Sequence, residues 1–82
     1  MKLFKIWQTV NNDYDTYDSA VVIATDEDDA RKINPGNIDG FVPVKPADYD
    51  SWCGIGDVKV EYLGEAKEGA KRSIVCASFN AG

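Results

Sequence analysis

Residues 13–18 contain three carboxylates, Asp13, Asp15 and Asp18, and are the first candidate for metal binding. Clustered carboxylate oxygens are the ligands that hard cations such as calcium prefer. The spacing differs from a calcium-binding EF-hand loop, because the sixth position counted from Asp13 is Asp18 instead of glycine, and the twelfth is Ala24 instead of glutamate. Two alternatives remain for these carboxylates: they form a weak cation site at the surface, or they accept hydrogen bonds from backbone N–H groups of a turn. We expect no structural metal in either case.

Nucleophilic and phosphate-binding groups give little support for catalysis. The chain has no His, so neither Cys53 nor Cys76 has an imidazole to generate its thiolate. Cys76 lies in an apolar strand pattern and is predicted to be a core residue, whereas Cys53 falls in a loop. The segment Gly54-Ile55-Gly56 lacks the lysine and the following helix of a phosphate-binding loop. We therefore expect a protein that is not an enzyme and holds no cofactor.

Aromatic side chains outside clear core positions are a stronger indication of recognition. Nine of the 82 residues are Phe, Trp or Tyr. Trp7 alternates within a strand pattern and is expected in the core, but exposed loops are predicted for Tyr14, Tyr17, Tyr49 and Trp52. Such residues supply interface hot spots or stack on nucleotide bases, and they equally well complete the core of a small domain.

Charge is distributed unevenly along the chain. The net charge is −5, and residues 11–50 hold ten acidic and three basic residues. This balance argues against direct binding of nucleic acid or an anionic membrane and favours a basic partner. The acidic half is either a surface that imitates nucleic-acid phosphates or a solvated face that keeps the protein soluble. The acidic candidates for binding are Asp15, Asp18, Asp26, Glu27, Asp28 and Asp29.

Hydrophobic periodicity places these residues on a few elements. Alternation and apolar runs predict strands over residues 2–10, 20–24, 58–62 and 73–79, with a short one at 41–44. Thr25 is expected to cap a helix of about nine residues that has Arg31 in its last turn and ends before Pro35. The order β-β-α-loop-β-β indicates an α+β fold: one small domain, residues 1–82, with about four mostly antiparallel strands and one short helix on a face.

The sequence carries no sign of membrane insertion. No apolar run approaches the ~18 residues of a membrane span, and the N-terminus lacks the apolar stretch of a secretion signal. We expect a soluble protein in the cytoplasm. The exposed edges of a four-stranded sheet would also allow a homodimer.

Four segments together resemble a known group of sequences. They are Leu3-Phe4-Lys5-Ile6-Trp7-Gln8, the block Asn12-Asp13-Tyr14-Asp15-Thr16-Tyr17-Asp18-Ser19-Ala20-Val21-Val22, the helix Asp26-Glu27-Asp28-Asp29-Ala30-Arg31, and the ending Ala77-Ser78-Phe79-Asn80-Ala81-Gly82. The chain is similar, over nearly its whole length, to small proteins encoded by bacteriophages and prophages. Small accessory proteins of phages often counteract host defence, so the resemblance implies an inhibitor that works in the cytoplasm of the bacterial host.

Two mechanisms fit this expectation. In the first, the protein binds and blocks a host immune protein, as anti-CRISPR proteins do, and its acidic half masks a basic groove. In the second, it sequesters a nucleotide immune signal by aromatic stacking, and Arg31, Lys71 or Arg72 pairs with phosphate. We expect the site at a rim formed by residues 12–19, residues 49–56 and the chain end at Asn80.

Overall fold

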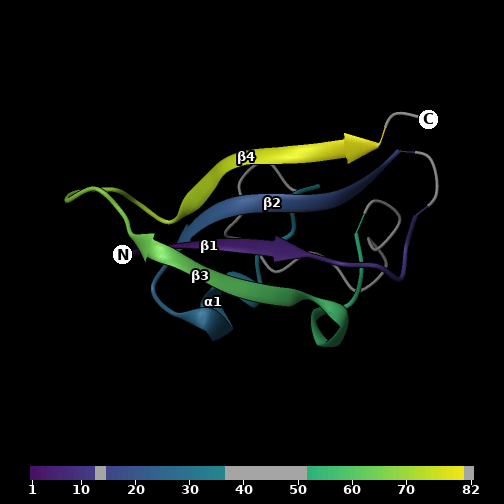
Figure 1. Cartoon of the computed structure of the whole chain (residues 1–82), viewed down its shortest axis with the longest axis horizontal. Coiled ribbons are helices and arrows are strands. Elements are labelled where there is room, and N and C mark those ends of the chain that lie inside the picture. The colour runs from purple at the N-terminus through teal and green to yellow at the C-terminus, as the bar shows by residue number, and fades with distance from the viewer. Residues whose placement is uncertain (13–14, 37–51, 81–82) are drawn as a thin grey trace.

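A four-stranded antiparallel sheet is the centre of the computed structural model, which describes residues 1–12, 15–36 and 52–80. The elements in chain order are β1 (Lys2–Trp7), β2 (Thr16–Ala24), helix α1 (Glu27–Arg31), the 3-10 turn η1 (Ile55–Asp57), β3 (Lys59–Glu65) and β4 (Ser73–Asn80). The strand order is β3-β1-β2-β4, so β3 and β4 are the two edges (Figure 1). The predicted α+β architecture is confirmed. The expected strand at 41–44 and the side chains of Tyr14 and Tyr49 lie outside the described residues.

The first strand ends earlier than predicted, because Gln8 turns the chain away from the sheet. The buried Gln8 amide donates to the carbonyl oxygens of Asn11 (2.7 Å) and Tyr17 (2.9 Å), and its own oxygen accepts from the N–H groups of Val10 and Asn11. This side chain satisfies three backbone groups of the turn and one of β2, in place of further strand pairing. Val10, predicted in the strand, therefore lies outside it and is 61% exposed.

The helix is shorter than predicted, and its cap is shifted by one residue. Asp26, instead of Thr25, is the N-cap, and its carboxylate accepts from the Asp29 N–H at 2.8 Å. The Asp29 carboxylate in turn accepts from the Thr25 N–H at 3.0 Å. This reciprocal pair resembles a capping box, except that the Asp29 carboxylate accepts from the N–H of the residue before the cap instead of from the cap itself. The resulting helix has five residues, and Ala30 is its buried one.

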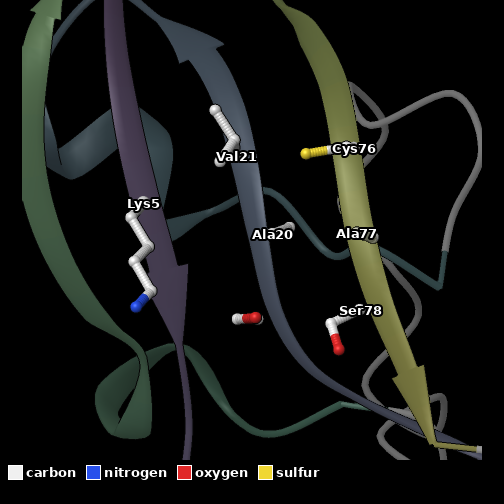
Figure 2. Close-up of a pocket in the computed structure, with 7 residues that line it drawn as sticks. Lys5, Ala20, Val21, Cys76, Ala77 and Ser78 are labelled. Carbon is white, nitrogen blue, oxygen red and sulfur yellow. The ribbon is translucent and has the colours of Figure 1, made fainter.

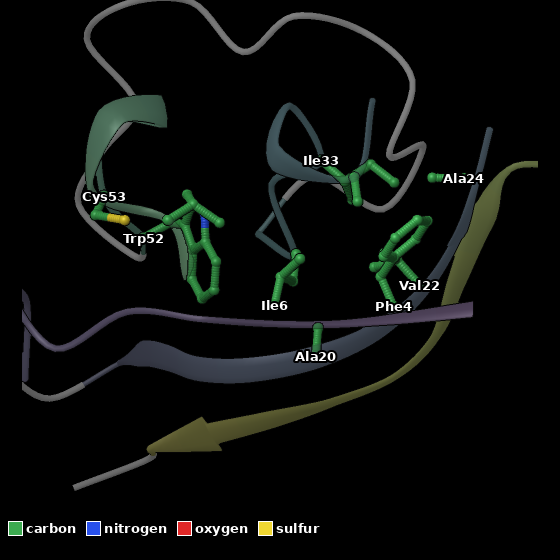
Figure 3. Packing of buried hydrophobic residues seen from close by; sticks show 10 residues of the cluster. Phe4, Ile6, Ala20, Val22, Ala24, Ile33, Trp52 and Cys53 are labelled. Carbon is green, nitrogen blue, oxygen red and sulfur yellow. The ribbon is translucent and has the colours of Figure 1, made fainter. Parts of the chain in front are cut away.

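One face of the sheet is covered by α1 and by residues 33–35 and 52–58. Alternate residues of β1 and β2 point toward this layer, as Figure 3 shows, because side chains of a strand alternate between faces. The buried hydrophobic residues are Phe4, Ile6, Ala20, Val22, Ala24, Ala30, Ile33, Trp52, Cys53 and Val58. The prediction that Trp52 lies on an exposed loop is wrong: the residue is 2% exposed, and its side chain lies beside Ile6 in the layer over the sheet.

The opposite face carries no helix or strand within the part of the chain that the structure describes. It presents Leu3, Lys5 and Trp7 from β1 and Ser19, Val21 and Ile23 from β2. Trp7 is consequently half-exposed instead of a core residue, with the Lys5 ammonium 5.4 Å from its ring centre. Cys76 pairs with Val21 at this face and is exposed, so its predicted place in the core is also wrong.

Candidate functional site

The acidic residues at the start of α1 are largely used by the fold. Asp29 accepts from the Thr25 N–H, from the Thr25 hydroxyl (3.2 Å) and from the Arg72 Nε (2.8 Å). Burial raises the pKa of Asp29, but these hydrogen bonds and the Arg72 charge outweigh it and hold the pKa below 3.8. Glu27 pairs with Arg31 at 3.1 Å, and Asp26 caps the helix. Asp28 is exposed and makes no hydrogen bond or ion pair among the described residues.

The arginines expected to pair with phosphate are bound to the chain itself. Arg31 donates to the Val58 carbonyl oxygen and to Glu27, and it borders a depression of about 410 Å³ between α1, η1 and the start of β3. Arg72 binds the Asp29 carboxylate and carbonyl. A phosphate would have to displace these partners, so the geometry gives no preformed phosphate site at Arg31 or Arg72.

The structure joins two of the three segments expected at the site. The Asp15 N–H donates to the Asn80 carbonyl at 2.7 Å, whereas residues 52–56 are joined on this side to Asn11, just outside residues 12–19: the Asn11 amide donates to the Trp52 carbonyl at 2.9 Å. The rings of Tyr17 and Phe79 lie with centroids 4.8 Å apart at 57°. We define the rim as Asp15, Tyr17, Asp18, Phe79 and Asn80.

The rim combines aromatic and acidic groups at one end of the sheet. Phe79 is 46% exposed, and both Asp15 and Asp18 are exposed. Asp15 has a φ of 60°, a left-handed conformation that aspartate tolerates better than most residues. Tyr17 lies in β2, where a loop was predicted, and its ring also packs against the core. Sequence reasoning missed Phe79, although an aromatic residue at the end of an uncharged strand was a usable signal.

The acidic residues of the chain do not form one face in the described structure. Asp15 and Asp18 lie at the start of β2, whereas residues 26–29 follow its end. The nine residues of β2 place the two groups about 26 Å apart. That separation exceeds the screening length of about 8–10 Å at physiological salt, so each group acts on a partner independently.

The uncovered face of the sheet holds a shallow depression of about 200 Å³ (Figure 2). Its lining residues are Lys5, Ser19, Ala20, Val21, Cys76, Ala77 and Ser78. This volume is below the roughly 300 Å³ at which small-molecule pockets begin. The other thiol, Cys53, is buried, and burial together with the Asp57 charge raises its pKa to about 11, so it stays protonated at neutral pH.

A metal site and a membrane-spanning helix each place requirements on the described residues. No group of three or more His, Cys, Asp or Glu side chains in residues 1–12, 15–36 and 52–80 could hold a metal ion. Within the same ranges, neither helical segment has the length and apolar character needed to cross a bilayer. Comparison of the chain with protein-family models, curated proteins and solved structures found no match.

Proposed function

We propose that the chain is a binding protein that inhibits a bacterial defence protein by covering a basic surface on it with the rim. The observation that carries this proposal is the contact of the exposed Phe79 ring with the half-buried Tyr17 ring, close in the chain to Asp15 and Asp18, two exposed carboxylates that make no ion pair among the described residues. Aromatic rings and carboxylates together suit arginine, since a guanidinium both stacks on rings and pairs with carboxylate oxygens. Arginine-rich grooves that bind nucleic acid are surfaces of this kind.

The nucleotide-sequestering alternative has less support. Trp52, one of the residues expected to stack on the base, is buried. Two of the residues expected to pair with phosphate are bound within the chain: Arg31 to Glu27 and the Val58 carbonyl, and Arg72 to Asp29. The resemblance to small phage proteins supplies the partner class, a host defence protein.

The first experiment measures protection of phage in bacterial strains that each carry one defence system. We expect expression of the chain to raise plaque counts in at least one strain, and Phe79→Ala to abolish the effect. An interface aromatic of this kind contributes about 2 kcal/mol, so its loss weakens a complex roughly thirtyfold. Leu63→Ala is the matched control, because Leu63 is 47% exposed on β3, away from the rim. Equal activity of the two variants, both verified as folded, would refute the rim as the binding surface.

A second experiment separates the two acidic groups. Asp18→Asn and Asp28→Asn remove the same charge from exposed positions at opposite ends of β2. With the partner recovered from the protected strain, we expect Asp18→Asn to weaken binding and flatten its dependence on salt, and Asp28→Asn to change neither. Native mass spectrometry of the recovered complex identifies a protein subunit or, against the proposal, a nucleotide.

A further inference from the structure

The two edges of the sheet differ in the way they are protected. Both edge strands have a register shift, at Leu63 in β3 and at Val75 in β4, but β3 also carries three exposed charged residues, Lys59, Glu61 and Glu65. The edge strand β4, Ser73–Asn80, has no charged residue and no proline in eight positions. Charged residues on an edge strand prevent it from pairing with a further strand. Of the two edges, β4 therefore lacks this protection.

Pairing of β4 with a further strand is favoured by its composition. Six of its residues are exposed, including Val75 (55%) and Phe79. Within residues 1–12, 15–36 and 52–80, no strand lies on its outer side (Figure 1). We propose that β4 pairs with β4 of a second copy of this chain, antiparallel across a two-fold axis, to give a continuous sheet of eight strands.

Charge favours a second copy in this orientation. Antiparallel pairing over residues 76–80 sets Asn80 of each copy beside Cys76 of the other, and the paired segment carries no charged side chain. It also places the two acidic rims at opposite ends of the paired strands, whereas parallel pairing would bring them side by side. The assembly closes at two chains, because the outer edges of the eight-stranded sheet are then both β3 with its charges.

The interface is expected to be modest in size. A register shift at Val75 interrupts β4, so uninterrupted pairing extends over residues 76–80. Pairing along one short strand buries less than the roughly 1,600 Å² of a standard stable interface. The dimer therefore dissociates on dilution, and because Phe79 and Asn80 lie in the paired segment, the monomer is the form that presents the whole rim.

Sedimentation velocity over a concentration series is the primary test, with two serine substitutions as a matched pair. Ser78 in β4 and Ser19 in β2 pair directly in register and border the same depression, so Ser78→Lys and Ser19→Lys place one positive charge on the same face. We expect Ser78→Lys to raise the dimer dissociation constant about tenfold and Ser19→Lys less than about twofold. Equal weakening by both would indicate stacking of uncovered faces and overturn the edge pairing.

Proline substitution tests the outward backbone directly. Neighbouring N–H groups of an antiparallel strand point to opposite sides, so one of Ala77 and Ser78 donates toward β2 and the other toward the open edge. Of Ala77→Pro and Ser78→Pro, the variant that keeps the native circular dichroism spectrum should be monomeric. A folded proline variant that still dimerises, a wild-type monomer at about 1 mM, or open-ended oligomers would each overturn the proposal. The result is independent of the proposed function, because no defence protein takes part.

Discussion

Asp29 is the acidic residue on which the docking of α1 depends, and Asp29→Asn measures its contribution. A five-residue helix has no stability of its own, so it relies on contacts to the sheet. The Asp29 carboxylate joins the residue before the cap, Thr25, to Arg72 at the start of β4. Hydrogen bonds to a charged group contribute about 1.5–3 kcal/mol each in favourable settings. Asp29 and Arg72 keep 22% and 17% of their side chains exposed, so solvent weakens their ion pair, and the substituted Asn retains one acceptor oxygen. We therefore expect Asp29→Asn to lower the free energy of unfolding by about 2 kcal/mol.

A loss of this size is large for the protein. A domain of 82 residues has a stability of about 4–12 kcal/mol, and 2 kcal/mol corresponds to a fall in Tm of about 10 °C. Urea unfolding followed by tryptophan fluorescence measures the free energy, since Trp52 is buried. Asp28→Asn is the control: it removes the same charge from the same helix at an exposed position and should cost about 0.5 kcal/mol.

The pH dependence tests the same reasoning. The pKa of Asp29 is lower in the folded chain than its ordinary value of 3.8. Its stabilisation is therefore complete above pH 3.8 and is lost as the pH falls through the folded pKa. We expect the stability gap between wild type and Asp29→Asn to be constant from pH 7 to pH 5 and to shrink below pH 3.8. A gap that persists unchanged in strong acid, or an Asp29→Asn variant as stable as Asp28→Asn, would refute the ion pair as its cause.

Two further predictions concern the buried layer and the thiols. Trp52→Ala should lower the free energy of unfolding by about 3–5 kcal/mol and leave the chain largely unfolded at 37 °C. Trp52→Phe should lower it much less, because this substitution removes an indole N–H that has no acceptor in the described structure. Thermal denaturation of both variants measures the difference, and equal losses would contradict the prediction. Under native conditions at pH 8, a thiol reagent should modify the exposed Cys76 and leave Cys53, with its pKa near 11, unmodified until denaturant is added, as mass spectrometry of the labelled chain will show.

The elements of the fold were predictable because their patterns are local. The apolar run at residues 20–24 indicated a central strand, and β2 is one of the two inner strands of the sheet. The ends of elements were less predictable, because single side chains decide them. Gln8 ends β1 by binding four backbone groups, and Asp26 with Asp29 fixes the start of α1. Nothing in residue type alone distinguishes these side chains from others nearby.

Burial depended on information that the sequence pattern does not hold. Alternation shows which residues share a face of a strand, but the order β3-β1-β2-β4 and the position of residues 52–58 decide which face is covered. Trp52 and Cys76 were assigned the wrong exposure for this reason. The Tyr17–Phe79 contact likewise follows from the register of β2 against β4, which brings together residues far apart in the chain.

The same topology changes the meaning of the acidic half of the chain. Counted along the sequence, residues 11–50 suggest one negative surface. In the fold, β2 divides their described acids into two groups. Residues 26–29 form a capping group held largely by Thr25, Arg31 and Arg72, whereas Asp15 and Asp18 lie near the exposed Phe79 ring and the half-buried Tyr17 ring. Charges already paired within a chain have less to gain from a partner, because binding must first release their own contacts. The rim is thus the better candidate for recognition, although residues 26–29 hold more carboxylates.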